Sequence, residues 1–177
     1  GTANEERWAA EVLTPFYEDV GDAIREVAPG APIFFDGTGF DAADTETAVE
    51  RPDRQGYVFA PHYYHPLVIY SDPADFSYDT DEGIGDWAAL GEEWELPVLL
   101  GEFGVRTDRD GAAEYIASNF DSLDRFVMHG TAWEYSTTED DWNDEGFSIT
   151  GHRGVETPAV SAVVRGYPRA VAGRLTA

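Results

Sequence analysis

The stretch that most constrains the fold is Leu96–Gly104, with the sequence LPVLLGEFG. Its first five residues are apolar, which predicts a strand buried on both faces, as in parallel sheets covered by helices. The strand runs into GEFG, so a carboxylate follows it between two glycines that allow close approach of backbone or ligand. Parallel α/β folds keep their functional residues at this end of the strands. We therefore expect Glu102 to be the reacting residue, the alternative being a glutamate that caps a turn or pairs with an arginine.

Apolar periodicity predicts alternating helices and strands along the rest of the chain. The expected helices span 5–27, 82–94, 111–126 and 158–172, and the expected strands span 32–35, 57–64, 96–100 and 127–133. The first helix places Trp8, Val12, Phe16, Val20, Ile24 and Val27 three or four residues apart. Thr14 and Pro15 form a capping signal at which it restarts, and a short helix is expected near 44–50. This order predicts one α/β domain with a parallel sheet and covering helices.

The composition excludes several classes of protein. The chain has 177 residues with 35 acidic side chains against 11 basic ones, all of them arginine, and a net charge of −24. Such a charge argues against nucleic acid or an anionic membrane as partner, and indicates an acid-rich, halophilic type of surface suited to high salt. GC-rich codon usage explains the missing lysine but not the excess acid. Without cysteine there is no disulfide or thiolate chemistry, and no apolar run predicts a membrane span.

Polar and aromatic side chains gather at three predicted strand ends. His62 and Tyr64 follow the second strand on one side of it, Glu102 follows the third, and Trp133 follows the fourth. An indole face suits a sugar ring, a tyrosine hydroxyl can stabilise a carboxylate, and no phosphate-binding glycine motif is present. Taken alone, Trp133 could equally be a core residue, and His62 could be a buried histidine whose hydrogen bonds are all made within the protein. Their coincidence with Glu102 favours a carbohydrate site.

Four segments and a tail carry a family resemblance. IFFDG, APHYYHP, LPVLLGEFG and GTAWEYS resemble the second half of a clan-A, family-5 glycoside hydrolase, with the nearest likeness to endoglycoceramidases. The tail VVRGYPRAVAG resembles the end of their last barrel helix, before a β-sandwich. The resemblance implies a TIM (β/α)8 barrel of which residues 1–177 are the C-terminal half, about strands five to eight. It also implies a retaining endo-glycosidase acting on a carbohydrate or glycolipid without metal or cofactor, and it favours a secreted location.

The same resemblance assigns roles to the four site residues. Glu102 falls on the nucleophile, His62 and Tyr64 on the pair after the sixth strand, and Trp133 on the indole that stacks on the sugar. The family's acid/base glutamate belongs to an Asn-Glu-Pro motif after the fourth strand, and this chain lacks that motif. Neither Asp36 nor Glu134 takes its place in the family pattern. We therefore expect the isolated chain to be inactive.

A half barrel leaves strand edges open, so a partner is expected. The candidates are a polypeptide or segment that carries strands one to four, and a second copy of the chain. Two other classes stay open: a non-catalytic carbohydrate-binding protein on the same scaffold, and an independent four-stranded, doubly wound domain. Two acidic segments, 79–83 and 140–146, resemble calcium loops but lack EF-hand spacing, so no metal site is expected.

Overall fold

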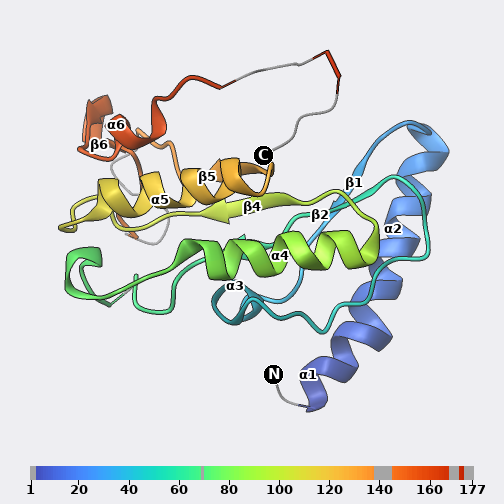
Figure 1. The fold of residues 1–177 in the computed structure, drawn as a ribbon. Helices are drawn as coiled ribbons and strands as arrows, with labels where there is room; N and C mark the ends of the chain where they lie inside the picture. Colours follow the sequence, from blue (N-terminus) through green and yellow to red (C-terminus); the bar gives the residue numbers. More distant parts are fainter. Residues whose placement is uncertain (1–2, 69, 138–144, 168–171, 174–177) are drawn as a thin grey trace.

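Short parallel strands form the centre of the chain in the computed structural model, which describes residues 3–68, 70–137, 145–167 and 172–173 (Figure 1). The strands are β1 (Ile33–Phe35), β2 (Tyr57–Phe59), β3 (His62–Tyr63), β4 (Leu99–Phe103) and β5 (His129–Ala132). β1 pairs with β2, and β3, β4 and β5 pair in that order, all in parallel. A parallel bridge from Phe59 to Val98 connects the two groups. The predicted parallel α/β architecture is confirmed.

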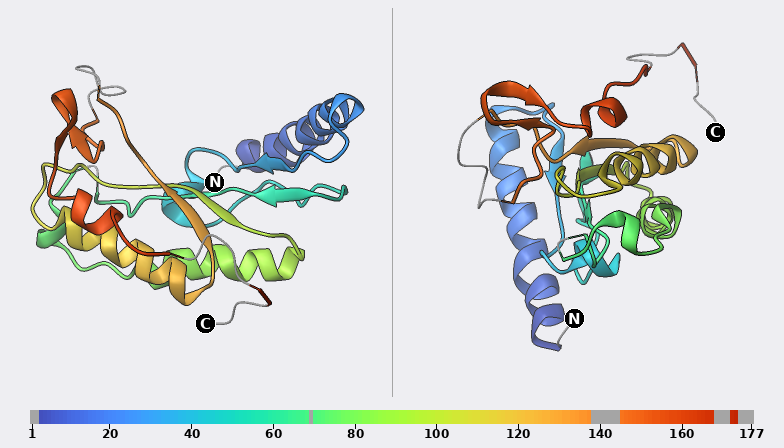
Figure 2. Two further views of the ribbon diagram at one scale, coloured as in Figure 1. Left: turned by 90° about the horizontal axis from the view of Figure 1, so that it is seen from above. Right: turned by 90° about the vertical axis from the view of Figure 1, so that its left-hand side faces the viewer.

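Helices pack against these strands and supply much of the core. The N-terminal helix consists of α1 (Ala3–Trp8), a π-helical turn (Ala9–Leu13) and α2 (Thr14–Val27), and the covering helices are α4 (Thr80–Trp94) and α5 (Ala112–Arg125). Figure 2 shows α4 and α5 side by side against the strands. α2 packs on the same face of β1 and β2 as α4, because Phe35 contacts both Tyr17 of α2 and Trp94 of α4. The shorter elements are α3 (Asp41–Asp44), η2 (Pro73–Asp75), β6 (Thr150–Gly151), η4 (His152–Gly154), β7 (Val155–Glu156) and α6 (Val160–Val163).

An aromatic cluster holds β1 and β2 against α4. Phe35 and Phe59 point to the same face of neighbouring strands, with ring centroids 5.2 Å apart. Phe59 meets Trp87 edge-on at 5.5 Å and Trp94 at 5.1 Å, and Trp87 is fully buried. Buried aromatic side chains contribute most to cores of this kind. The indole N–H of Trp87 also donates to the carbonyl of His62 at 3.0 Å, so the core directly fixes the backbone at the end of β3.

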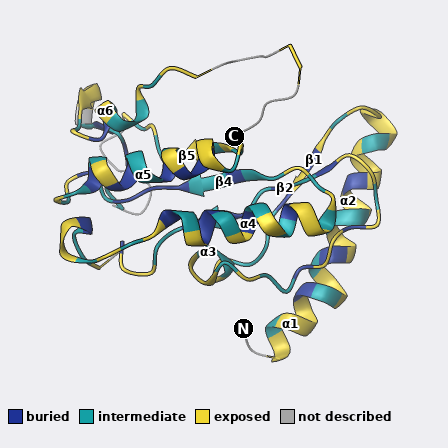
Figure 3. Ribbon diagram, in the orientation of Figure 1, coloured by how far each residue is buried: buried dark blue, intermediate teal, exposed yellow. Residues whose placement is uncertain are grey.

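The N-terminal helix restarts at Pro15 as predicted, but not through a cap. Pro15 has no N–H to donate to the preceding turn, and the helix widens into the π-helical turn there. The hydroxyl of Thr14 donates to the carbonyl of Ala9 at 3.1 Å and accepts from the N–H of Glu50 at 3.0 Å, so the predicted capping role of Thr14 is wrong. The helix buries its small residues Ala9 and Gly21, while the apolar residues of the predicted stripe are exposed (Figure 3).

Several predicted boundaries differ from the structure. The strand expected over 57–64 is divided between β2 and β3 by Ala60–Pro61, since proline cannot donate a ladder hydrogen bond. β4 begins at Leu99, three residues later than predicted, and it includes Glu102 within the strand. The short helix expected near 44–50 instead spans Asp41–Asp44, and Thr45 ends it in the left-handed conformation.

The C-terminal region departs most from the prediction. The helix expected over 158–172 is a single turn, α6, because Val164 adopts an extended conformation two residues before Gly166. Residues 168–171 lie outside the described part of the chain. The hairpin of β6 and β7 was not predicted; it pairs Thr150 with Glu156.

Candidate active site

Glu102 lies in β4, between β3 and β5. It pairs in register with His62 of β3. A β-carbon on Gly101 would lie 2.7 Å from the carbonyl oxygen of Ala60, and one on Gly104 would overlap the carbonyl oxygen of Trp133. Neither position has room for a β-carbon, so both glycines are needed for the close approach of the neighbouring backbone, as the sequence suggested.

One oxygen of the Glu102 carboxylate faces two possible donors. The hydroxyl of Tyr64 donates to Oε2 at 3.0 Å, and Nδ1 of His62 lies 3.3 Å from the same atom. Burial, followed by the nearby Glu102 carboxylate, raises the pKa of Tyr64 well above its usual range, so the phenol stays neutral and donates. The structure therefore brings three of the four predicted residues into contact. The side chain of Glu102 is 30% exposed, which leaves it accessible to a ligand.

Asp36 joins this group through the other ring nitrogen of His62. It follows β1, and its Oδ2 lies 3.3 Å from Nε2 of His62, while the N–H of Gly37 donates to its Oδ1 at 2.7 Å. Burial raises the pKa of Asp36; His62 and the Gly37 N–H oppose this, and Asp41 and Glu102 add to it. The sequence placed Asp36 at a strand end but gave it no role.

Trp133 reaches the same edge of the sheet from β5. Its backbone N–H donates to the carbonyl of Phe103 at 2.9 Å, and its indole N–H donates to Oε2 of Glu145 at 3.2 Å. The peptide bond between Trp133 and Glu134 is cis. Phe147 packs edge-on against Tyr64 with ring centroids 5.9 Å apart. Neither Glu145 nor Phe147 was predicted, because both follow an acidic loop that carries no strand or helix signal.

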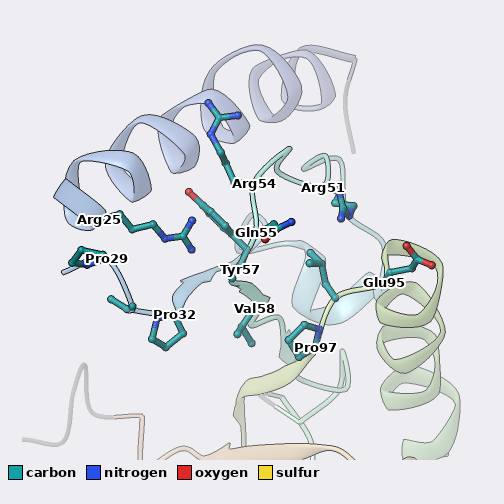
Figure 4. A pocket seen from close by; sticks show the side chains of 14 residues that line it. Arg25, Pro29, Pro32, Arg51, Arg54, Gln55, Tyr57, Val58, Glu95 and Pro97 are labelled. Atoms are coloured by element: carbon teal, nitrogen blue, oxygen red, sulfur yellow. The ribbon is translucent and has the colours of Figure 1, made fainter. Parts of the chain in front are cut away.

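A cavity lies at the opposite end of the strands (Figure 4). It measures about 630 Å³ and is lined by residues that precede or begin β1, β2 and β4, together with the end of α2. Three arginines, Arg25, Arg51 and Arg54, line it; Arg25 lies over the Tyr57 ring at 5.1 Å, and Arg54 pairs with Asp22 at 3.1 Å. In parallel barrels this end contributes to stability and the other end to chemistry. Glu102, at the other end, therefore remains the candidate for the functional site.

The acidic segment at 79–83 has structural partners. Asp79 caps α4 by accepting the N–H of Asp81 at 3.0 Å, and Asp81 pairs with Arg125 at 3.0 Å. In the part of the chain that the structure describes, no three histidine or acidic side chains gather as a metal site. The second segment, 140–146, lies mostly outside the described residues. No helix among the described residues is long and apolar enough to cross a membrane.

A carboxylate at the C-terminal ends of parallel strands, contacted by tyrosine and histidine, fits what the resemblance to glycoside hydrolases implied for Glu102, Tyr64 and His62. The sequence model of the cellulases, glycosyl hydrolase family 5, matches residues 1–144, and the chain belongs to this family. A comparison with curated proteins gives no match.

Similar solved structures agree on the fold. Endo-glycoceramidase II from Rhodococcus sp., in complex with a five-membered iminocyclitol, aligns with a TM-score of 0.75 and 23% identity over 96% of this chain and 39% of that one. An endoglucanase gives a TM-score of 0.69 and 18% identity over 90% of this chain and 54% of that one. A hyperthermophilic endo-beta-1,4-glucanase in complex with substrate gives 0.68 and 14% over 85% and 53%. The chain therefore forms a partial TIM barrel and spans about two-fifths to half of these proteins.

Proposed function

We propose that this chain carries the nucleophile of a retaining endo-glycosidase. The observation that carries the proposal is the contact of Tyr64 and His62 with one oxygen of Glu102 at the strand ends. A hydrogen bond from a neutral phenol stabilises the ionised carboxylate, which is the form that attacks. The substrate class, a β-linked carbohydrate or glycolipid, follows from the similarity to endoglycoceramidase and endoglucanases.

In this mechanism Glu102 attacks the anomeric carbon as the bond to the leaving oxygen breaks, which gives a glycosyl ester. The leaving oxygen takes its proton from an acid that lies outside this chain, and the same group then deprotonates the water that cleaves the ester. Tyr64 donates to Oε2 throughout, and His62 orients the carboxylate. Trp133 stacks on the sugar beside the cleaved bond. No step calls for a metal or an organic cofactor.

Residues 1–177 are proposed to be the C-terminal half of the barrel, strands five to eight. Support comes from the apolar stripe of the N-terminal helix, which is exposed among the described residues: Trp8 is 48%, Val12 50% and Phe16 55% exposed. β1 also exposes surface that a partner could cover. Among the described strands it pairs with β2 alone, and the side chain of its Phe34 is 51% exposed. Burying a large apolar side chain contributes about 1.5–3 kcal/mol, so covering this surface favours a partner strongly. The fitting partner is a segment with strands one to four, rather than a second copy that would duplicate Glu102.

The test compares the isolated chain with a polypeptide extended by the residues encoded before Gly1. An upstream strand ending in Asn-Glu-Pro is expected, together with hydrolysis of an aryl glycoside that Glu102→Gln abolishes. The isolated chain should show no turnover above the uncatalysed rate. Turnover by the isolated chain that depends on Glu102 would refute the need for a second half. Sugar binding without hydrolysis by the extended polypeptide would favour the non-catalytic alternative.

A further inference from the structure

The ring of His62 lies between two carboxylates, one on each nitrogen. Nδ1 is 3.3 Å from Oε2 of Glu102, and Nε2 is 3.3 Å from Oδ2 of Asp36. The ring also packs over Gly101, where a β-carbon would lie 3.1 Å from Cδ2 of His62. The Trp87 indole holds the carbonyl of His62 from behind. The position of the ring is therefore fixed by its place in β3, by its packing against the backbone of Gly101 and by the hydrogen bond from Trp87 of the core.

With both carboxylates ionised, these two contacts favour a ring that carries a hydrogen on each nitrogen. A neutral imidazole has one N–H and one lone pair, whereas an ionised carboxylate only accepts. With both carboxylates ionised and the ring neutral, a nitrogen lone pair would face an oxyanion on one side. An imidazolium removes that repulsion because both of its nitrogens donate.

We propose that Asp36 is a positioning residue that keeps His62 doubly protonated, so that Nδ1–H and the Tyr64 hydroxyl together hold Glu102 as a carboxylate. Asp36 does not touch the reacting atoms; it acts through His62. The Gly37 N–H occupies Oδ1 of Asp36 and leaves Oδ2 for the ring. Gly37 is itself tightly placed, since a β-carbon there would overlap the carboxylate of Asp41.

Other titratable groups around this line have defined partners. Asp41 of α3 accepts the backbone N–H of Thr38 at 2.9 Å and its hydroxyl at 2.6 Å, so both of its oxygens are engaged. Tyr17 of α2 lies near Asp36, and burial raises its pKa, so it remains neutral. Tyr64 likewise remains neutral and donates to Glu102. These contacts leave His62 as the cation between Asp36 and Glu102.

The proton count gives opposite expectations for two variants. In Asp36→Asn, the new amide can donate to Nε2, so a neutral ring keeps its hydrogen on Nδ1 and still meets Glu102. In Glu102→Gln, the new amide can donate to Nδ1, so a neutral ring keeps its hydrogen on Nε2 and meets Asp36. The wild-type ring carries both hydrogens.

Long-range ¹H–¹⁵N NMR spectra of the ¹⁵N-histidine-labelled chain near neutral pH test this directly, because they distinguish a ring nitrogen with a hydrogen from one without. The chain has four histidines, and loss of one set of signals in His62→Gln assigns His62. His65 supplies a neutral reference, because burial lowers its pKa. The control is Asp44→Asn, which removes the same charge from the exposed end of α3.

In the wild type and in Asp44→Asn, both ring nitrogens of His62 should carry a hydrogen. In Asp36→Asn only Nδ1 should carry one, and in Glu102→Gln only Nε2. A neutral His62 in the wild type overturns the proposal even if Asp36→Asn does not fold. An unchanged His62 spectrum in Asp36→Asn also overturns it. The catalytic consequence rests on the proposed function, but the protonation state does not. A neutral His62 in an active, Glu102-dependent hydrolase would refute the role of Asp36 alone, and a doubly protonated His62 in an extended protein without hydrolysis would refute the function alone.

Discussion

Replacing Gly101 by alanine tests whether the close spacing of β3 and β4 builds the site. The new β-carbon would lie 2.7 Å from the carbonyl oxygen of Ala60, a backbone atom that cannot rotate away, and 3.1 Å from Cδ2 of His62. Forcing a methyl group into a filled space costs about 1–3 kcal/mol. Alanine also lowers the backbone entropy of the unfolded chain relative to glycine, which raises the free energy of unfolding by about 0.4–1 kcal/mol. The net expectation is a loss of about 1–2 kcal/mol in the free energy of unfolding.

Thermal unfolding followed by circular dichroism measures this loss. For a chain of this size each kcal/mol shifts the Tm by about 2–4 °C, so Gly101→Ala should lower the Tm by about 2–8 °C. The matched control is Gly30→Ala, because Gly30 is exposed in a turn and a β-carbon there meets nothing within 4 Å. Its free energy of unfolding should equal that of the wild type or exceed it by up to about 1 kcal/mol, through the same unfolded-chain entropy. A Gly101→Ala protein as stable as the control would refute the close packing of the strands at Glu102.

Three further predictions follow from the charges and donors of the site and the surface. Because burial raises the pKa of Asp36 above 3.8, its ionisation costs stability. The stability of Asp36→Asn relative to the wild type, measured by urea unfolding, should therefore be higher at pH 7 than below about pH 3.8, where Asp36 is protonated in both the folded and the unfolded chain. A relative stability that rises as the pH falls would contradict the sign. Tyr64→Phe removes a donor to a charged group, worth about 1.5–3 kcal/mol, so kcat/KM of the extended enzyme should fall about 10–100-fold, whereas an unchanged value would mean that Glu102 does not need the phenol. The chain has a net charge of −24, so its Tm should rise between 0.1 and about 1 M NaCl, because the Debye length falls from about 10 to 3 Å and the acidic side chains repel one another less. A flat or falling Tm would argue against a surface suited to high salt.

Much of the site could be predicted because strand ends are visible in the sequence. The apolar run before Glu102 and the two-residue spacing of His62 and Tyr64 place all three at one edge of a parallel sheet, and the structure confirms their contact. The role of Asp36 could not be predicted in this way. Its contact with His62 depends on how β1 and β3 are positioned by the core, and no local spacing encodes that distance.

The element boundaries failed where backbone chemistry competes with apolar periodicity. The pattern of valines predicted a long final helix, yet Val164 turns to an extended conformation and the helix ends at Val163. The N-terminal stripe was correctly assigned to a helix, but periodicity alone does not show what covers an apolar face. Among the described residues that stripe is exposed, and the proposed N-terminal half of the barrel would cover it.

The central claim is that Glu102 is the nucleophile, and covalent trapping tests it most directly. A 2-deoxy-2-fluoro glycosyl fluoride forms a slowly hydrolysed ester with the nucleophile of a retaining glycosidase, because the fluorine slows both steps and fluoride leaves without a proton. Peptide mass spectrometry of the extended polypeptide should find one sugar, attached to the carboxylate of Glu102, and none in Glu102→Gln. A sugar attached to another carboxylate, or hydrolysis with inversion and no trapped ester, would contradict the account.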